Sequence, residues 1–359
     1  MKRIRTSDLV PGMITAEDIF NYERQLILPR GSVLTDKAIN KLTFYSILQI
    51  RIDDTVVPDT VAPVVMTPPS YLDKFKSSPA FIQFKKNFEA DADNFKNAIN
   101  DLIEKNEPID LDKLMNNTLQ TLEPSQTNPN VFEMLHCMRE YDDATYIHCM
   151  NVSLICNMLA RWLRFDEKVT RDVTISGLLH DVGKTKIPDS IIKKPDKLTQ
   201  QEYDIVKRHP QEGYDILKNS ISSEKILNAV LMHHERCDGS GYPDGLTDSQ
   251  IDSYAKIVAI ADVYDALTSA RVYRGPLCPF KAIALFEKEG LQKYDVRFIL
   301  TFLENVVNTY YTNTVLLNNG VTGKIIFINK SNLAAPTIQT DNGFLDLSKH
   351  PELYIEDII

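Results

Sequence analysis

The sequence lacks any uninterrupted apolar run of the roughly 18 to 20 residues that a membrane-spanning helix needs. No apolar stretch follows Met1-Lys2-Arg3, so no secretory signal is visible. Cysteine is sparse as well: the chain has 5, an odd number, and no Cys-x-x-Cys pair. A disulfide framework is therefore not expected, and a reducing compartment fits better. We predict a soluble, cytoplasmic protein without a membrane segment.

An excess of basic charge is also missing. The chain carries 40 Lys and Arg against 49 Asp and Glu, which gives a formal net charge of -9 at pH 7. This balance argues against a broad surface for nucleic acid or anionic lipid, so we expect no DNA partner. An anionic substrate would need metal ions and a few basic side chains grouped locally. At 359 residues the chain is long enough for two or three units.

The N-terminal part divides into a module and a linker. Residues 1–54 contain short apolar pieces separated by Pro-Gly and Pro-x-Gly turns, with one short helix expected over 35–42. Residues 55–70 are rich in proline, which removes backbone donors and disfavours helix, so we predict an extended linker. The module carries no catalytic constellation, and we expect it to be regulatory.

A helical connector is expected over 71–128. Its apolar residues recur at seven-residue spacing with others filling the same side: Phe81, Phe84, Phe88, Ala92, Phe95, Ile99 and Leu102. Such a stripe can be a coiled-coil seam, which would imply a homodimer. The alternative is a helix packed on the neighbouring domain. We favour this alternative because the stripe lacks regular flanking charge pairs.

The remaining chain reads as a helical domain over 129–312 and a small β appendage over 313–359. Apolar runs with turns such as Asn318-Asn319-Gly320 indicate the strands. In the helical domain, Thr199 and Glu202 form a capping-box pattern. Gly183 suits a helix terminus. The predicted fold class is therefore mainly α.

Residues of the types that bind metals recur through the helical domain, each in or beside an apolar helical run: His148, His180, Asp181, His209, His233, His234 and Asp262. A single histidine of this kind is more often a satisfied core residue than a ligand. Burying five imidazoles and two carboxylates together would cost several kcal/mol unless divalent cations paired with them. Nitrogen and oxygen ligands without cysteine favour Fe or Mn, with Zn and Ni as alternatives.

A glycine-rich loop follows the paired histidines and ends in Gly241-Tyr242-Pro243. Its backbone can approach a ligand closely, and Tyr242 offers a stacking face. The alternative is an ordinary tight surface turn. We interpret Glu235 and Asp238 as loop-fixing residues and not as metal ligands.

The ordered set of His148, His180-Asp181, His209, His233-His234, the Gly-Tyr-Pro loop and Asp262 resembles the HD-GYP family. This family is a bacterial branch of the HD metal-dependent phosphohydrolases that hydrolyses cyclic di-GMP. The resemblance covers roughly residues 129–312 and implies an HD-type all-helical metal-binding domain. A small module often precedes such domains, which is consistent with residues 1–54.

The resemblance also implies roles for single residues. Asp181 would bridge two metals, with His148, His180 and Asp262 completing one site and His209, His233 and His234 the other. Some members bind a third metal through a glutamate where this chain has Ala144, so we predict two metals. Two ions about 3.5 to 4 Å apart can hold a bridging hydroxide that attacks phosphorus in line. Asp181 and Lys184 are the predicted catalytic residues, and the predicted substrate contacts are Lys184, Gly241, Tyr242, Pro243, Arg271 and Arg274.

The main hypothesis is a phosphodiesterase that cleaves cyclic di-GMP to pGpG or onward to GMP; the sequence does not specify which is the end product. One alternative is a catalytically weak cyclic dinucleotide receptor. Another is an HD phosphohydrolase for a different cyclic dinucleotide such as cyclic GMP-AMP. The family resemblance also implies a diguanylate cyclase as a partner. Neither the native metal nor the signal sensed by the N-terminal module is specified by the sequence.

Overall fold

The computed structural model describes residues 2–6, 9–10, 12–20, 26–35, 38–39, 42, 47, 49–53, 75–105, 107–114, 116, 131–138, 144–192, 194, 198–269 and 277–359. The chain divides into two units, which are described separately. One is made mainly of Met1–Pro69, and the other comprises Ser70–Ser269 with Leu277–Ile359. The predicted linker, residues 55–70, lies outside the described residues.

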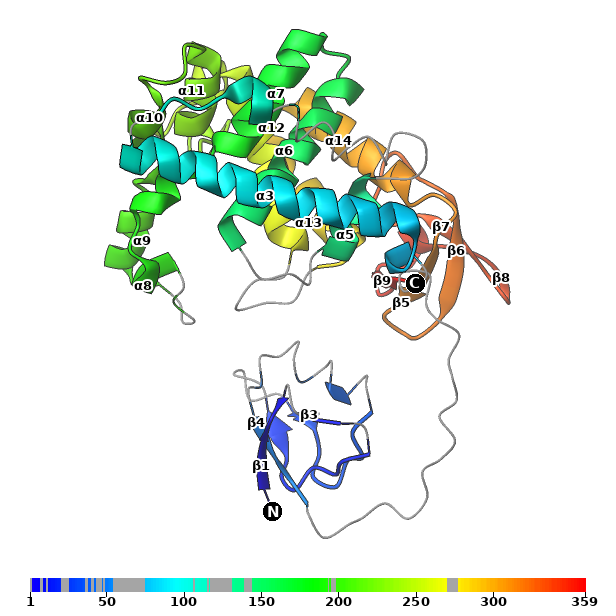
Figure 1. Cartoon of the computed structure of the whole chain (residues 1–359). Helices are drawn as coiled ribbons and strands as arrows, with labels where there is room; N and C mark the ends of the chain where they lie inside the picture. The colour runs from blue at the N-terminus through cyan, green and yellow to red at the C-terminus, as the bar shows by residue number, and fades with distance from the viewer. Residues whose placement is uncertain are drawn as a thin grey trace. The chain divides into compact units, whose positions relative to one another are not determined.

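The N-terminal unit contains two antiparallel strand pairs (Figure 1). β1 (Lys2–Arg5) pairs with β4 (Gln49–Ile52), and β2 (Ile19–Phe20) pairs with β3 (Leu26–Leu28). Alternation along β4 buries one side of the strand, as a half-buried strand requires. The buried apolar residues of this unit form their own small core: Leu9, Ile19, Ile27, Leu34, Leu42, Ile50 and Ile52. The strand-rich module predicted from the turn residues is confirmed.

The larger unit begins with α3 (Pro79–Lys105), which lies across its helices (Figure 1). All the residues of the predicted apolar stripe are buried, and α3 packs on α5 (Val131–Met138) and α6 (Ala144–Trp162). The stripe is therefore used within the chain. It is not available as a coiled-coil seam, and the packed-helix interpretation is confirmed.

The centre of this unit is built from α6, α7 (Glu167–Leu179) and α12 (Ser253–Thr268). α12 is buried on nearly every side, which explains its Ala, Val and Ile content. Around these helices lie η2 (Val182–Lys186), α8 (Asp189–Ile192), α9 (Gln200–Val206), α10 (His209–Leu217), α11 (Glu224–Met232) and η3 (Asp248–Gln250). The capping box predicted at Thr199 and Glu202 is present at the start of α9.

The C-terminal part comprises α13 (Pro279–Lys293), α14 (Val296–Thr309), η4 (Leu347–Lys349) and a five-stranded antiparallel sheet in the order β8-β7-β6-β5-β9. Its strands are β5 (Thr314–Leu317), β6 (Thr322–Phe327), β7 (Thr337–Thr340), β8 (Gly343–Asp346) and β9 (Ile355–Ile358). The predicted C-terminal strands are confirmed. The buried face of the sheet, including Val315, Ile325 and Ile338, joins the core of the helices, so sheet and helices share one core.

Among the described residues, no helix combines the length and the apolar character needed to cross a bilayer.

Candidate metal centre

The residues predicted to bind metal meet inside the larger unit, although they come from separate elements. His148 lies within α6 and Asp262 within α12. His180 is the C-terminal cap of α7, and His233 is that of α11. His209 is the first residue of α10. The histidines therefore reach a common centre from the C-terminal ends of two helices, the start of a third and the interior of a fourth.

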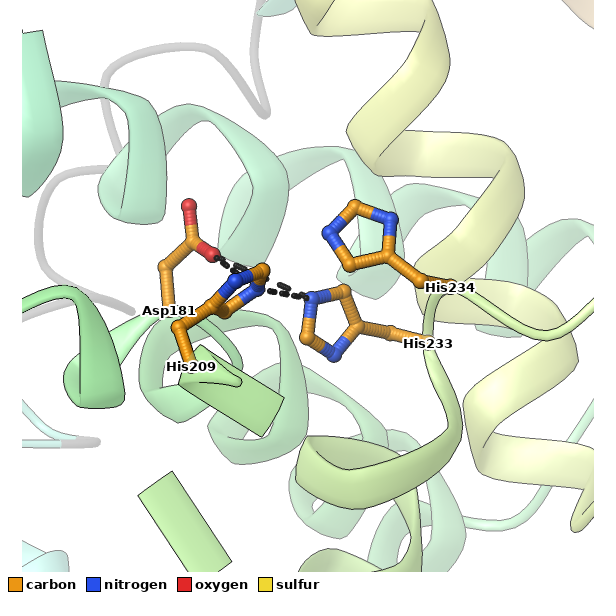
Figure 2. Close-up of side chains that lie close together, drawn as sticks. All are labelled: Asp181, His209, His233 and His234. Carbon is orange, nitrogen blue, oxygen red and sulfur yellow. Dashed lines mark hydrogen bonds and ion pairs between the residues drawn. The ribbon is translucent and has the colours of Figure 1, made fainter. Parts of the chain in front are cut away.

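The nitrogen and oxygen atoms that could bind a metal, called donor atoms here, form two groups. Within each group all of these atoms lie within 4.8 Å of one another. Figure 2 shows the first group, which is Asp181, His209, His233 and His234. The second group is His148, His180 and Asp262.

The two oxygens of Asp181 face different groups. Oδ2 lies 3.5 Å from His148 Nε2 and 3.4 Å from His180 Nε2. Oδ1 lies 3.2 Å from His209 Nε2 and 3.8 Å from His233 Nε2. The side chain thus stands between the two groups, with one oxygen directed at each.

Hydrogen bonds define the tautomers of three histidines. Nδ1 of His180, His209 and His233 lies 2.7, 2.7 and 2.8 Å from the backbone carbonyl oxygen three residues earlier. A carbonyl only accepts, so Nδ1 carries the hydrogen and a neutral ring presents the lone pair of Nε2. These three lone pairs point to the centre.

Two of these lone pairs face each other. Nε2 of His209 lies 3.2 Å from Nε2 of His233, as the dashed line in Figure 2 marks. Two neutral acceptors at this separation repel unless a cation lies between them. Imidazole nitrogens bound roughly 2.0 to 2.1 Å from one ion, at about a right angle, are about 3 Å apart. The separation therefore matches shared binding of a cation.

The second group also calls for positive charge. His148 donates from Nδ1 to Asp265 Oδ2 at 2.6 Å, and its Nε2 lies 3.1 Å from Asp262 Oδ1. Burial lowers the pKa of His148, but hydrogen bonds and charges of Asp262 and Asp265 outweigh burial and raise it to about 9. His180 Nε2 is buried and has no hydrogen-bond partner among the described residues. A buried nitrogen without a hydrogen-bond partner is suited to bind a metal ion.

Burial and nearby charges also act on the pKa values of Asp181, His233 and His234. Burial raises the pKa of Asp181, but nearby groups, foremost the charge of Lys184, outweigh burial and hold that pKa well below its usual range. Lys184 forms an ion pair with Asp181 Oδ2. Burial lowers the pKa of His233 and, to about 3, that of His234. Neutral imidazoles with carboxylates are the donor set that divalent transition metals prefer, so the residues present fit such ions.

The glycine-rich loop is held against this centre by Glu235. Only 2% exposed, its carboxylate accepts hydrogen bonds from the backbone N–H of Asp244, Gly245 and Leu246 at 2.7, 3.1 and 2.9 Å. The structure therefore confirms that Glu235 fixes the loop. Asp238 does so locally, by accepting from the backbone and hydroxyl of Ser240.

The loop also presents an aromatic ring at the centre. The ring of Tyr242 stacks on His234, with 4.6 Å between ring centroids and 22° between planes. A side chain at Gly241 would place Cβ 2.4 Å from Glu235 Cα, so only glycine permits this close return of the backbone. Pro243 is exposed next to these residues.

Gly183 has a different role from the predicted helix terminus. It lies within η2, and its backbone is not in the left-handed region. An added Cβ would lie 2.0 Å from the carbonyl oxygen of His209. Glycine is needed here because η2 packs directly on the backbone of α10.

Two predicted substrate residues, Arg271 and Arg274, lie outside the described residues. Ala144 is the first residue of α6, four positions before His148. One important residue, Asp265, was missed by sequence reasoning. The sequence did contain a signal: Asp265 is a second acidic residue, one turn after Asp262, in a largely apolar helix.

Comparisons with known proteins agree with this geometry. Residues 114–298 match the HD domain family. A relative, "Cyclic di-GMP phosphodiesterase PA4108" of Pseudomonas aeruginosa, is 42% identical over 148 residues, which cover 41% of this chain and 36% of the relative. Another, "3'3'-cGAMP-specific phosphodiesterase 1" of Vibrio cholerae, is 39% identical over 133 residues, which cover 37% and 31%. The chain thus spans only about a third of the length of these relatives.

A solved structure shares the fold. It is Bd1817, a HDG"Y"P protein from Bdellovibrio bacteriovorus, with a TM-score of 0.51 and 17% sequence identity, and the match covers 85% of this chain and 99% of that one. The family match spans more than half of the present chain and includes every residue of the two donor groups. The chain therefore belongs to the HD domain family and is of its HD-GYP type.

Proposed function

We propose that this protein is a metal-dependent phosphodiesterase that hydrolyses cyclic di-GMP to pGpG or onward to GMP. The observation that carries the proposal is the pair of buried donor groups with Asp181 between them and Lys184 beside it. The similarity to a relative named as a cyclic di-GMP phosphodiesterase supports the choice of substrate.

The two donor groups would hold two divalent metals, Fe or Mn, bridged by Asp181. His148, His180 and Asp262 would complete one site, and His209, His233 and His234 the other. When bound, such a pair supplies Lewis acidity that activates water and neutralises phosphate charge. Ala144, in place of the glutamate that the family resemblance associates with a third metal, supports two ions.

The chain's own residues would bind and orient the dinucleotide. Lys184 places a cation next to Asp181, where it can stabilise the negative charge that develops on a phosphate. Tyr242, stacked on His234, offers its other face to a base. Arg271 and Arg274 are proposed to contact phosphate or the edge of guanine, because a guanidinium forms paired hydrogen bonds with either.

A second candidate substrate is cyclic GMP-AMP. The relative from Vibrio cholerae named for 3'3'-cGAMP supports it at nearly the same identity. Both dinucleotides carry two phosphodiesters and a guanine, so the metal centre alone does not separate them. A third possibility, a receptor without useful turnover, is distinguished by binding without product.

The test uses anaerobically purified protein. Metal content is measured first, and then products from cyclic di-GMP and cyclic GMP-AMP are separated by chromatography. Asp181→Ala is expected to lose metal and activity. Asp341→Ala, an exposed aspartate in the β7–β8 turn, is the matched control and should retain both. Intact substrate with fully loaded protein would contradict hydrolysis, and faster cleavage of cyclic GMP-AMP would reassign the substrate.

A further inference from the structure

Asp265 occupies a position behind the metal centre. It lies on α12 one turn after Asp262 and is 4% exposed. Its Oδ2 accepts the Nδ1 hydrogen of His148 at 2.6 Å. Its Oδ1 accepts from Asn151 Nδ2 at 2.9 Å and from Ser269 Oγ at 2.9 Å. The carboxylate is thus held by three separate donors.

We propose that Asp265 is a positioning residue that selects the tautomer and ring orientation of His148, and so sets the affinity of the metal held with His180 and Asp262. The proposal rests on the metal sites of the proposed function. A carboxylate can only accept, so His148 keeps a hydrogen on Nδ1, and Nε2, which faces Asp262 and Asp181, is the nitrogen that would lose its hydrogen and bind the metal. A carboxylate behind a ligating histidine also strengthens its donation to the metal.

His148 differs from three other histidines of the centre in the group that accepts its Nδ1 hydrogen. His180 and His233 each donate Nδ1–H to a carbonyl of their own helix, and His209 donates to the carbonyl of Val206, the last residue of α9. Their orientation therefore follows from local backbone. His148 lies inside α6, about one turn after its first residue, where the nearby carbonyls accept from the helix backbone, so its partner must come from another element. Asp265 is that partner, supplied by α12.

The same carboxylate connects the centre to the end of α12. Ser269, the C-terminal cap of this helix, donates from its hydroxyl to this carboxylate, and from its backbone N–H to the backbone carbonyl of Asp265 at 2.8 Å. Residues 270–276 follow directly and contain Arg271 and Arg274. A simple structural tie between α6 and α12 would use the same hydrogen bonds, so the test must separate positioning from general stability.

The separation comes from measuring two metals in one protein. Full-length chain is stripped with chelator and titrated with Zn²⁺ or Mn²⁺ in competition with an indicator. Asp265→Ala is expected to weaken one of two bound ions by roughly 10- to 100-fold and to leave the other unchanged. Ser269→Ala, which removes a donor from Asp265 but leaves His148 untouched, is the matched control and should bind both ions normally.

Asp265→Asn keeps an acceptor for His148 but removes the charge. The amide of Asn151 can turn to accept from the new side chain, because Asn151 Oδ1 has no hydrogen-bond partner among the described residues. We expect a loss of several-fold at the same metal. In the Zn²⁺-loaded protein, nitrogen NMR should show His148 with hydrogen on Nδ1 in the wild type and in Asp265→Asn.

Each result bears on the inference. Equal weakening of both ions, or wild-type affinity in Asp265→Ala, would overturn it. If Asp265→Ala does not fold, the inference is overturned when Asp265→Asn binds both metals with wild-type affinity. The titration uses no substrate, so it tests the two proposals separately. A wild-type chain that binds no metal refutes the proposed function. Variants that bind two ions with wild-type affinity refute only the role of Asp265.

Discussion

Replacing Gly183 with alanine tests whether close backbone packing holds the metal centre together. The added Cβ would lie 2.0 Å from His209 O, 2.5 Å from Gly213 N and 2.9 Å from His209 C. All three are backbone atoms, so no rotation of a side chain can relieve the overlap. The start of α10 must therefore move away from η2 by about 1 Å to reach a tolerable separation.

This movement would act on one half of the centre. His209 is on α10, and its Nε2 lies 3.2 Å from Asp181 Oδ1. Overpacking of a well-packed interior costs about 1 to 3 kcal/mol, so the free energy of unfolding should fall by that amount. A displacement near 1 Å at a reacting centre lowers turnover on the order of 100-fold. The ion held with His209 should be lost before the ion held with His148.

Gly213→Ala is the matched control because Gly213 lies on the other side of the same contact. Its added Cβ would first meet Val230 Cγ1, a side-chain atom, at 2.9 Å. Alanine also gains about 1 kcal/mol over glycine inside a helix, so little net loss is expected. Denaturant unfolding and metal analysis of both variants provide the measurement. Wild-type stability and two bound ions in Gly183→Ala would refute the reasoning.

Two further predictions concern the loop and the histidines. Glu235→Gln replaces an acceptor with a donor facing the N–H of Leu246, Asp244 or Gly245, so unfolding free energy should fall by about 1 to 3 kcal/mol; unchanged denaturation would contradict this. The metal-free protein should be most stable near pH 6.5. Below pH 6.5, His234 takes up a proton in the unfolded state but not in the folded state, because folding lowers its pKa from 6.5 to about 3. The free energy of unfolding therefore falls by about 1.4 kcal/mol per pH unit. Above pH 6.5, His148, raised to about 9, keeps its proton only when folded, so stability falls again; a steady rise from pH 5 to 9 in thermal melts would be inconsistent.

Local patterns in the sequence were sufficient to predict the elements and the membership of the centre. Helical periodicity placed the stripe of α3, and turn residues indicated the strands of both β regions. The residues of the two donor groups were all found, because several histidines and aspartates beside apolar helices cannot be buried cheaply without a shared partner. Their role as metal ligands stays a prediction.

Contacts between distant segments decided the rest. The stripe of α3 had two possible partners, and only the packing on α5 and α6 selected one. The role of Gly183 depended on how closely α10 approaches, and that of Asp265 on which face of α12 meets His148. Periodicity specifies which face of an element is apolar but not what covers it. The partners of these residues are therefore set by long-range packing, and the same packing supplies the geometry on which the metal centre depends.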